Sequence, residues 1–268
     1  MKGLLFYDTV GARRNAWFID RMVTVAKNCG CELLPVVTDD LAEALKACYE
    51  KPDFCIVRTI SPSLTEELEG LGIRVFNNST TSKAANDKWQ TYLMAKRLNI
   101  PVIKTVSLKD GEVETSFPRV IKSVDGHGGI EVFLAHNAEE CKEILSLHPN
   151  KHFISQELSS EPGVDMRVYV MGESVIAATK RTSKSDFRSN FSLGGNAELD
   201  TPTEDMLRVI EAIKNELNFD FVGIDFIRHN GKWILNEIED VVGTRMIYSL
   251  TDLDAAEIYI KYILDQLK

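Results

Sequence analysis

Three acidic residues near the C-terminal end of the chain stand in a pattern typical of a metal site. Asp225 interrupts the apolar run 222–227, and Glu237 and Glu239 end the next apolar run. Residues two apart on a strand point to the same side, so Glu237 and Glu239 share a face, and pairing of the two runs can bring Asp225 to it. Three converging carboxylates repel one another unless a cation lies among them. Oxygen ligands with positions left for phosphate and water suit Mg²⁺, so the trio predicts a magnesium site rather than a solvated strand edge.

A glycine-rich turn that follows a lysine is the second chemical signal. Lys122 ends a predicted strand, and Gly126, His127, Gly128 and Gly129 come directly after it. Glycines let the backbone approach a polyphosphate closely, and successive N–H groups can form an anion-binding nest. The turn does not match G-x-x-x-x-G-K-[ST] and no helix start follows, which excludes a P-loop and a Rossmann turn. The pattern predicts a phosphate site, against the alternative of an ordinary hairpin turn.

A basic polar stretch in residues 180–195 is the third signal, and it contains Arg181, Phe187 and Arg188. The guanidinium fork bonds two oxygens at once, which suits phosphate and carboxylate groups. Phe187 indicates that the stretch packs against another part of the protein. The alternative is a solvent-exposed loop whose charges bind nothing specific.

The segment Gln156-Glu157-Leu158 lies at the end of a predicted strand. It could present backbone N–H and C=O groups to an adenine edge, although a plain strand exit fits equally well. No Ser–His or Cys–His pattern indicates a side-chain nucleophile.

The elements that must position these residues follow from the alternation of apolar runs and helical patterns. Strands alternating with helices in residues 1–78 predict βαβ units and a mostly parallel sheet. Residues 79–158 predict one long helix over 79–98, ended by Ile100-Pro101, and then strands at 119–122, 130–134 and 152–156. Residues 159–268 predict a hairpin over 166–180, a helix over 203–217, a second hairpin over 222–238 and a final helix over 252–267. The fold class is α/β with α+β lobes, divided at 1–78, 79–158 and 159–268.

The composition of the chain argues against several classes of function. The chain has 268 residues, of which 44% are hydrophobic and 26% charged, and its net charge is −9. This charge argues against nucleic acid as the main partner, and no apolar run approaches the roughly 20 residues that cross a bilayer. Five scattered cysteines without a C-x-x-C pair predict reduced thiols. A cytoplasmic protein with no membrane partner is the expectation.

Taken in order, these residues resemble the ATP-grasp superfamily, and most closely its RimK-type glutamate ligases. The likeness runs from about Asn77 to the C-terminal helix and is most specific in the string of residues 186–190 and in Gly223-x-Asp225 with Glu237-x-Glu239. Its other pieces are Asn78-Ser79, Asp87-Lys88, Ile100-Pro101 with Thr105, Lys122 with the glycine turn, Gln156-Glu157-Leu158 and Gly163-x-Asp165-x-Arg167. The resemblance implies an N-terminal parallel lobe followed by two lobes that clamp ATP between them.

The resemblance also implies roles for single residues. Asp225, Glu237 and Glu239 would hold two Mg²⁺ ions, for which Mn²⁺ could substitute. The catalytic residues would be Arg188, Arg167 and Lys122. ATP would be bound by Lys88, Lys122, the flap Gly126, His127, Gly128 and Gly129, the adenine side Gln156, Glu157 and Leu158, the ribose side Asp165, and Arg181, Arg188, Ser189 and Asn190. The substrate would be bound by Arg58, Asn190 and Arg245.

Three departures from the family pattern bear on specificity. The family usually has asparagine where Glu239 stands, a proline-containing loop where residues 240–243 stand, and glycine where Glu131 stands. Because residues 240–245 face the acceptor in relatives, these changes leave the identity of the acceptor undetermined.

The predicted reaction is the ATP-dependent joining of a carboxylate to an amine through an acyl-phosphate. Its expected form is addition of an amino acid such as glutamate to a peptide, protein or small-molecule acceptor. Two alternatives remain: a dipeptide or amino-acid ligase of a biosynthetic pathway, and a nucleotide-binding regulatory protein without catalysis. The resemblance also allows a homo-oligomer.

Overall fold

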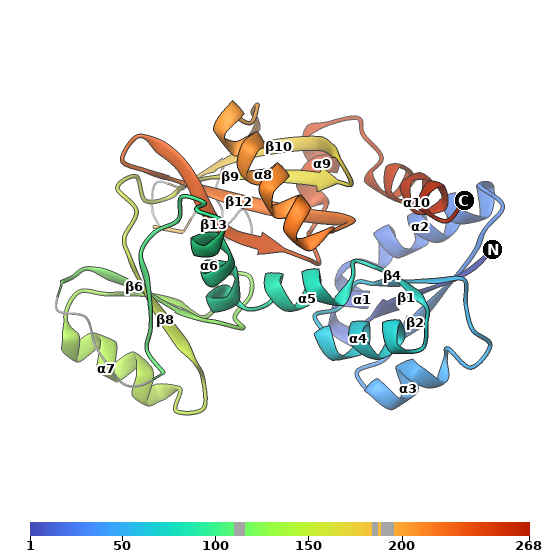
Figure 1. The fold of residues 1–268 in the computed structure, drawn as a ribbon, viewed down its shortest axis with the longest axis horizontal. Coiled ribbons are helices and arrows are strands. Elements are labelled where there is room, and N and C mark those ends of the chain that lie inside the picture. The colour runs from blue at the N-terminus through green and yellow to red at the C-terminus, as the bar shows by residue number, and fades with distance from the viewer. Residues whose placement is uncertain (110–115, 184–186, 189–195) are drawn as a thin grey trace.

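Three sheets follow one another along the chain in the computed structural model, which describes residues 1–109, 116–183, 187–188 and 196–268 (Figure 1). The first is parallel, in the order β2 (Glu32–Val37), β1 (Lys2–Tyr7), β3 (Phe54–Val57) and β4 (Arg74–Phe76). The predicted parallel sheet is therefore confirmed. Its connections are the helices α1 (Thr9–Arg14), α2 (Ala16–Asn28), α3 (Leu41–Lys46) and α4 (Pro62–Gly70).

The prediction of one helix over residues 79–98 is wrong. The structure has two, α5 (Ser79–Ala85) and α6 (Lys88–Arg97), because the Asp87 carboxylate accepts hydrogen bonds from the N–H groups of Trp89 and Gln90 and so caps a new helix. The break places Lys88 at the first turn of α6, where its N–H donates to the Val124 carbonyl beside the glycine turn.

The second sheet is antiparallel, in the order β5 (Thr105–Ser107), β8 (Phe153–Glu157), β6 (Arg119–Ser123) and β7 (Val132–Ala135). Its three longer strands were predicted, and β5 was not. Helix α7 (Ala138–Leu147) packs on one face through Cys141, against a core that contains Ile121 and Phe153. The other face is left toward the third sheet.

The third sheet carries the acidic trio. It is antiparallel, in the order β11 (Asn196–Leu199), β10 (Ser174–Thr182), β9 (Val164–Met171), β12 (Phe221–His229) and β13 (Lys232–Glu239). Both predicted hairpins are confirmed, and the sheet also contains β11, a strand that was not predicted. Helices α6 and α8 (Glu204–Leu217) share one apolar core with a face of this sheet.

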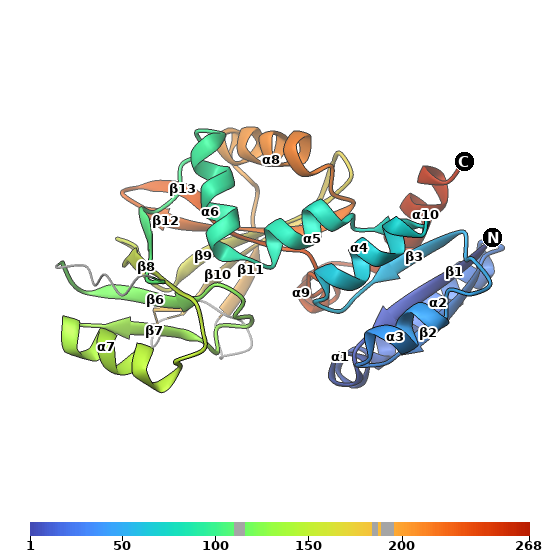
Figure 2. The same cartoon turned by 60° about the horizontal axis from the view of Figure 1, so that its bottom comes forward.

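The C-terminal segment returns to the first sheet. The predicted helix over 252–267 starts later, as α10 (Ala255–Gln266) capped by Asp254, and an unpredicted helix, α9 (Arg245–Leu250), precedes it. Helix α10 packs on α2 (Figure 1), in a single core that also holds residues of β1, β9 and β12. Figure 2 shows that the two ends of the chain lie near each other at this first sheet. Each stretch of the division 1–78, 79–158 and 159–268 contains one sheet, and we propose it as the lobe division, with α10 docked on the first lobe. Among the described helices, none is long and apolar enough to cross a bilayer.

Candidate nucleotide and metal site

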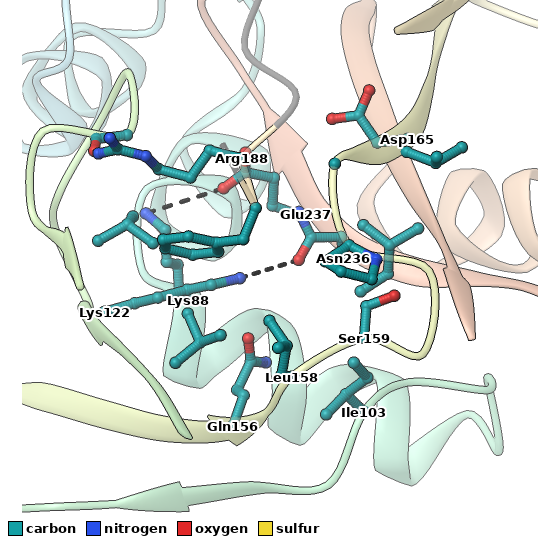
Figure 3. Close-up of a pocket in the computed structure, with 18 of the residues that line it drawn as sticks. Lys88, Ile103, Lys122, Gln156, Leu158, Ser159, Asp165, Arg188, Asn236 and Glu237 are labelled. Carbon is teal, nitrogen blue, oxygen red and sulfur yellow. Dashed lines mark hydrogen bonds and ion pairs between the residues drawn. The ribbon is translucent and has the colours of Figure 1, made fainter. Parts of the chain in front are cut away.

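A cavity lies between the second and third sheets and contains about 860 Å³ of space that protein atoms do not fill, open solvent at its mouth included (Figure 3). Apolar side chains line it, among them Val120 on β6, Ile227 on β12 and Ile103 in the segment before β5. Twelve of the predicted site residues also line it: Lys88, Lys122, Gly126, Gly128, Gly129, Gln156, Glu157, Leu158, Asp165, Arg188, Glu237 and Glu239. Five others, His127, Arg167, Arg181, Arg58 and Arg245, are not part of its lining, and Asp225 lies beneath it.

Two lysines reach into this cavity from different elements. Lys88 Nζ lies 3.9 Å from Glu237 Oε2 and donates a hydrogen bond to the Gly126 carbonyl (Figure 3). Lys122 comes from β6 and places its Nζ 3.0 Å from Asn236 Oδ1 on β13. Burial disfavours the charged amine and lowers the pKa of Lys122 to about 8, although Glu237 acts in the opposite direction. The two ammonium groups make this end of the cavity suitable for a polyphosphate.

The acidic trio converges as the strand pattern predicted. Asp225 on β12 pairs with Glu237 on β13, and one carboxylate oxygen from each of Asp225, Glu237 and Glu239 lies within 4.8 Å of the others. Two guanidinium groups lie next to Asp225 and Glu239. Arg167 bonds both Asp225 and Glu239, and Arg181 Nη2 lies 2.7 Å from Asp225 Oδ2.

These arginines set the charge states of the acids. Burial alone would raise the pKa of Asp225, but Arg167 and Arg181 outweigh it and hold that pKa at about 2. Burial raises the pKa of Glu239 to about 7, with the nearby Asp225 and Glu237 charges adding to the shift. The two arginines therefore favour the ionised form of Asp225.

The donor set fits a hard divalent cation. All three side chains offer oxygen, which Mg²⁺ prefers. Among the described residues, Lys88 is the only basic group within ion-pair distance of Glu237, and at 3.9 Å it leaves the Glu237 oxygens accessible. The Asp225 oxygens accept bonds from Arg167 and Arg181, so a cation bound there would share this carboxylate with them.

A hydrogen-bond relay fixes the side chain of Gln156 on β8. The Thr105 hydroxyl donates to the Ile103 carbonyl at 2.9 Å, so its oxygen is left to accept from Gln156 Nε2 at 2.8 Å. The amide oxygen of Gln156 then points into the cavity (Figure 3). The relay thus presents a fixed acceptor at the end of the cavity that the sequence predicted for adenine.

Several predicted binding residues are held by other protein groups. Both oxygens of Asp165 accept hydrogen bonds from Arg181, each 2.6 Å long, and both residues are buried. Arg188 Nη1 donates to the Gly129 carbonyl at 2.8 Å, which joins the basic stretch to the glycine turn, and Phe187 lines the cavity. The predicted residues Ser189 and Asn190 lie outside the described part of the chain.

The two arginines predicted to grip a substrate lie away from the cavity. Arg58 is buried, and its Nη2 donates to the Val242 carbonyl at 2.7 Å. Arg245 is exposed, and its Nη2 lies 3.3 Å from the Arg14 carbonyl. Arg58 therefore fixes the backbone segment that follows Glu239, at the junction of the first and third sheets.

Sequence reasoning missed Asn236, which contacts Lys122, because it stands one residue from Glu237. Strict strand alternation counted from Glu237 would send it to the opposite face. It also missed Asn77, whose amide bonds Phe221 and Asp240 and so ties β4 to the third sheet. The only signal for Asn77 in the sequence was its place at the end of a predicted strand.

Comparison with known proteins agrees with this geometry. The pattern of the RimK-like ATP-grasp domain matches residues 85–263. An uncharacterised protein of Mycoplasma pneumoniae is 33% identical over 69% of this chain and 65% of its own, so the match spans slightly less than two thirds of that relative. A probable alpha-L-glutamate ligase of Haemophilus influenzae is 28% identical over 75% of this chain and 70% of its own. Among solved structures, the D-alanine–D-alanine ligase of Bacillus anthracis complexed with ATP shares the fold with a TM-score of 0.78, at 13% identity, over 100% of this chain and 97% of its own. The chain belongs to the RimK-like ATP-grasp family.

Proposed function

We propose that this protein is an ATP- and magnesium-dependent ligase that joins a carboxylate to an amine through an acyl-phosphate. One observation carries the proposal: Lys88, Lys122 and the acids Glu237 and Glu239 line one cavity together with the glycine turn. Ammonium groups beside metal-ligating oxygens suit a nucleoside triphosphate with its divalent ion. The family membership and the relative described as a probable alpha-L-glutamate ligase support the same reaction.

In this mechanism the substrate carboxylate attacks the γ-phosphorus of ATP, the bond to the bridging oxygen breaks, and ADP leaves. The amine then attacks the acyl carbon, loses a proton, and releases phosphate to give the amide. Lys88 and Lys122 stabilise charge on the phosphate oxygens, and Arg188 stabilises the oxyanion of the tetrahedral intermediate. Bound Mg²⁺, held by Asp225, Glu237 and Glu239, would neutralise phosphate charge; two ions and replacement by Mn²⁺ belong to the same proposal.

The residues of this chain also protect the reaction from water. Arg188 holds the carbonyl of Gly129, and both residues line the cavity. Excluding water matters because a free acyl-phosphate hydrolyses. We propose Gln156, Glu157 and Leu158 for the adenine end and Asp165 with Arg181 for the ribose side.

The acceptor is a peptide, protein tail or small molecule that receives an amino acid such as glutamate. Two other candidates are a dipeptide or amino-acid ligase and a nucleotide-binding regulator without turnover. The retained trio of acids, with Lys122 and Arg188, favours an enzyme over a regulator, because a binder needs no such set. A panel of amino acids and peptides, scored by amine-dependent ADP release, separates the candidates.

The decisive variant is Glu237→Gln, which keeps the side-chain shape but removes a charge from the metal site. We expect amine-dependent ADP release to fall by at least about a hundredfold, the range seen when a main electrostatic group of an active site is removed. Glu173→Gln is the control, because Glu173 lies on the β9–β10 turn of the same sheet with its side chain 85% exposed. Near wild-type turnover by Glu237→Gln would refute the metal assignment.

A further inference from the structure

A β-bulge in β13 turns one asparagine toward the cavity. Asp225 pairs with Glu237 and Phe226 pairs with Leu235, so Asn236 is the extra residue between two successive pairs. Such a bulge bends the strand and redirects a side chain, and bulges are frequent next to active sites.

The burial of the neighbouring residues shows the result of this bulge. Leu235 and Ile238 both belong to the apolar core beneath the sheet, although residues three apart on a regular strand point to opposite faces. Asn236, Glu237 and Glu239 all line the cavity. The bulge therefore adds a polar side chain to the cavity while Leu235 stays in the core.

The contact with Lys122 fixes how the Asn236 amide is turned. A lysine ammonium has only donors, so the atom 3.0 Å from Lys122 Nζ must be the amide oxygen (Figure 3). The two N–H groups of the amide then remain, and no described residue accepts a hydrogen bond from Asn236 Nδ2. The side chain thus holds a cation with one end and offers donors with the other.

A neutral amide is the suitable side chain for this position. A carboxylate would pair with Lys122 and cancel the charge that a phosphate needs, and it would add a fourth acid beside Glu237. An apolar side chain would leave the half-buried ammonium without this acceptor. Asparagine keeps the ammonium oriented without neutralising it.

We propose that Asn236 is a phosphate-positioning residue: its amide oxygen fixes the Lys122 ammonium, and its amide N–H groups donate to the polyphosphate of the bound nucleotide. The inference rests on the proposed function for the identity of the ligand, but not on turnover. It predicts that Asn236 acts on the phosphate part of the ligand and leaves the nucleoside part unaffected.

The test measures binding of ADP with Mg²⁺, and of adenosine, by titration calorimetry. Asn236→Leu should weaken ADP binding about tenfold or more, the range for a hydrogen bond to a charged group, and leave adenosine binding unchanged. Asn236→Asp should also weaken ADP binding, because it keeps an oxygen toward Lys122 but replaces the N–H donors with a charge. Asn196→Leu is the matched control, since Asn196 is exposed on β11 of the same sheet.

A double-mutant cycle with Lys122→Met tests whether Asn236 acts through the lysine. In the Lys122→Met background, Asn236→Leu should have a clearly smaller effect on ADP binding than in the wild type. The positioning role would be refuted if the two substitutions weakened ADP binding independently, so that their fold-losses multiplied in the double variant. It would also be refuted if Asn236→Leu weakened adenosine binding as much as ADP binding. If wild-type protein binds ADP but joins no amine, the proposed reaction fails while the Asn236 inference stands or falls on its own measurements.

Discussion

Arg167 donates two parallel hydrogen bonds to Asp225, from Nε to Oδ1 and from Nη2 to Oδ2, each 2.7 Å long. The same Nη2 lies 2.6 Å from Glu239 Oε1, so one guanidinium spans two acids of the trio. Arg167 and Asp225 are both buried, and removing one member of a buried pair leaves an uncompensated charge.

Arg167→Met should therefore lower the free energy of unfolding by about 3 kcal/mol or more. Chemical denaturation followed by circular dichroism measures it. Arg97→Met is the control, because Arg97 forms a comparable two-bond pair with Glu216 while its side chain is 60% exposed, and we expect a loss of about 1 kcal/mol or less. Equal losses in the two variants would contradict a special stabilising role for the Arg167 pair.

The lowered pKa of Lys122 predicts a pH dependence of nucleotide use. In the free enzyme the ammonium loses its proton as pH rises through about 8, and the neutral amine cannot stabilise phosphate charge. The kcat/KM for ATP should therefore fall as pH rises through about 8. Lys122→Arg should lack this alkaline limb, since a guanidinium stays protonated.

The lowered pKa of Lys122 also predicts how the folding stability of the protein changes with pH. Between about pH 8 and the ordinary lysine pKa of 10.5, the unfolded chain binds the proton that the folded chain has released. Stability contributed by this group therefore increases with pH across that window. Lys122→Met should flatten this part of the stability profile; an unchanged slope would show that Lys122 does not titrate there.

The relay from Thr105 to Gln156 predicts selection among purine nucleotides. A fixed amide oxygen accepts from the 6-amino group of adenine and faces an acceptor oxygen in guanine. Thr105→Val should free the amide to turn and reduce the ratio of kcat/KM for ATP over GTP by about tenfold. Thr201→Val, at an exposed position, is the control. A ratio unchanged from wild type would show that the relay does not set base preference.

The structure indicates a stabilising role for Arg58, whereas the sequence predicted that Arg58 binds the substrate. Its bond to the Val242 carbonyl predicts that Arg58→Met lowers the free energy of unfolding by about 1–3 kcal/mol, because a buried carbonyl loses its donor. Arg13→Met, at an exposed position, should change it little. A raised KM for the carboxylate or amine substrate with unchanged stability would instead support the substrate-binding role predicted from the sequence.

The sequence by itself was sufficient for features that depend on local periodicity. The parallel sheet of residues 1–78 follows from strands that alternate with helices, and the two hairpins of residues 159–268 follow from strands joined by turn residues. So does the convergence of Asp225, Glu237 and Glu239, because the period of two is kept at all three positions.

Only the tertiary structure decided the features that break a local rule or join distant segments. The bulge at Asn236 reverses strand alternation for one residue, and Asp87 interrupts a helix whose apolar pattern continues through it. The guanidinium of Arg167, 58 residues from Asp225 in the sequence, supplies charge balance to the trio. Periodicity is a property of neighbouring residues, whereas ion pairs and bulges depend on contacts between strands that the chain brings together only when it folds.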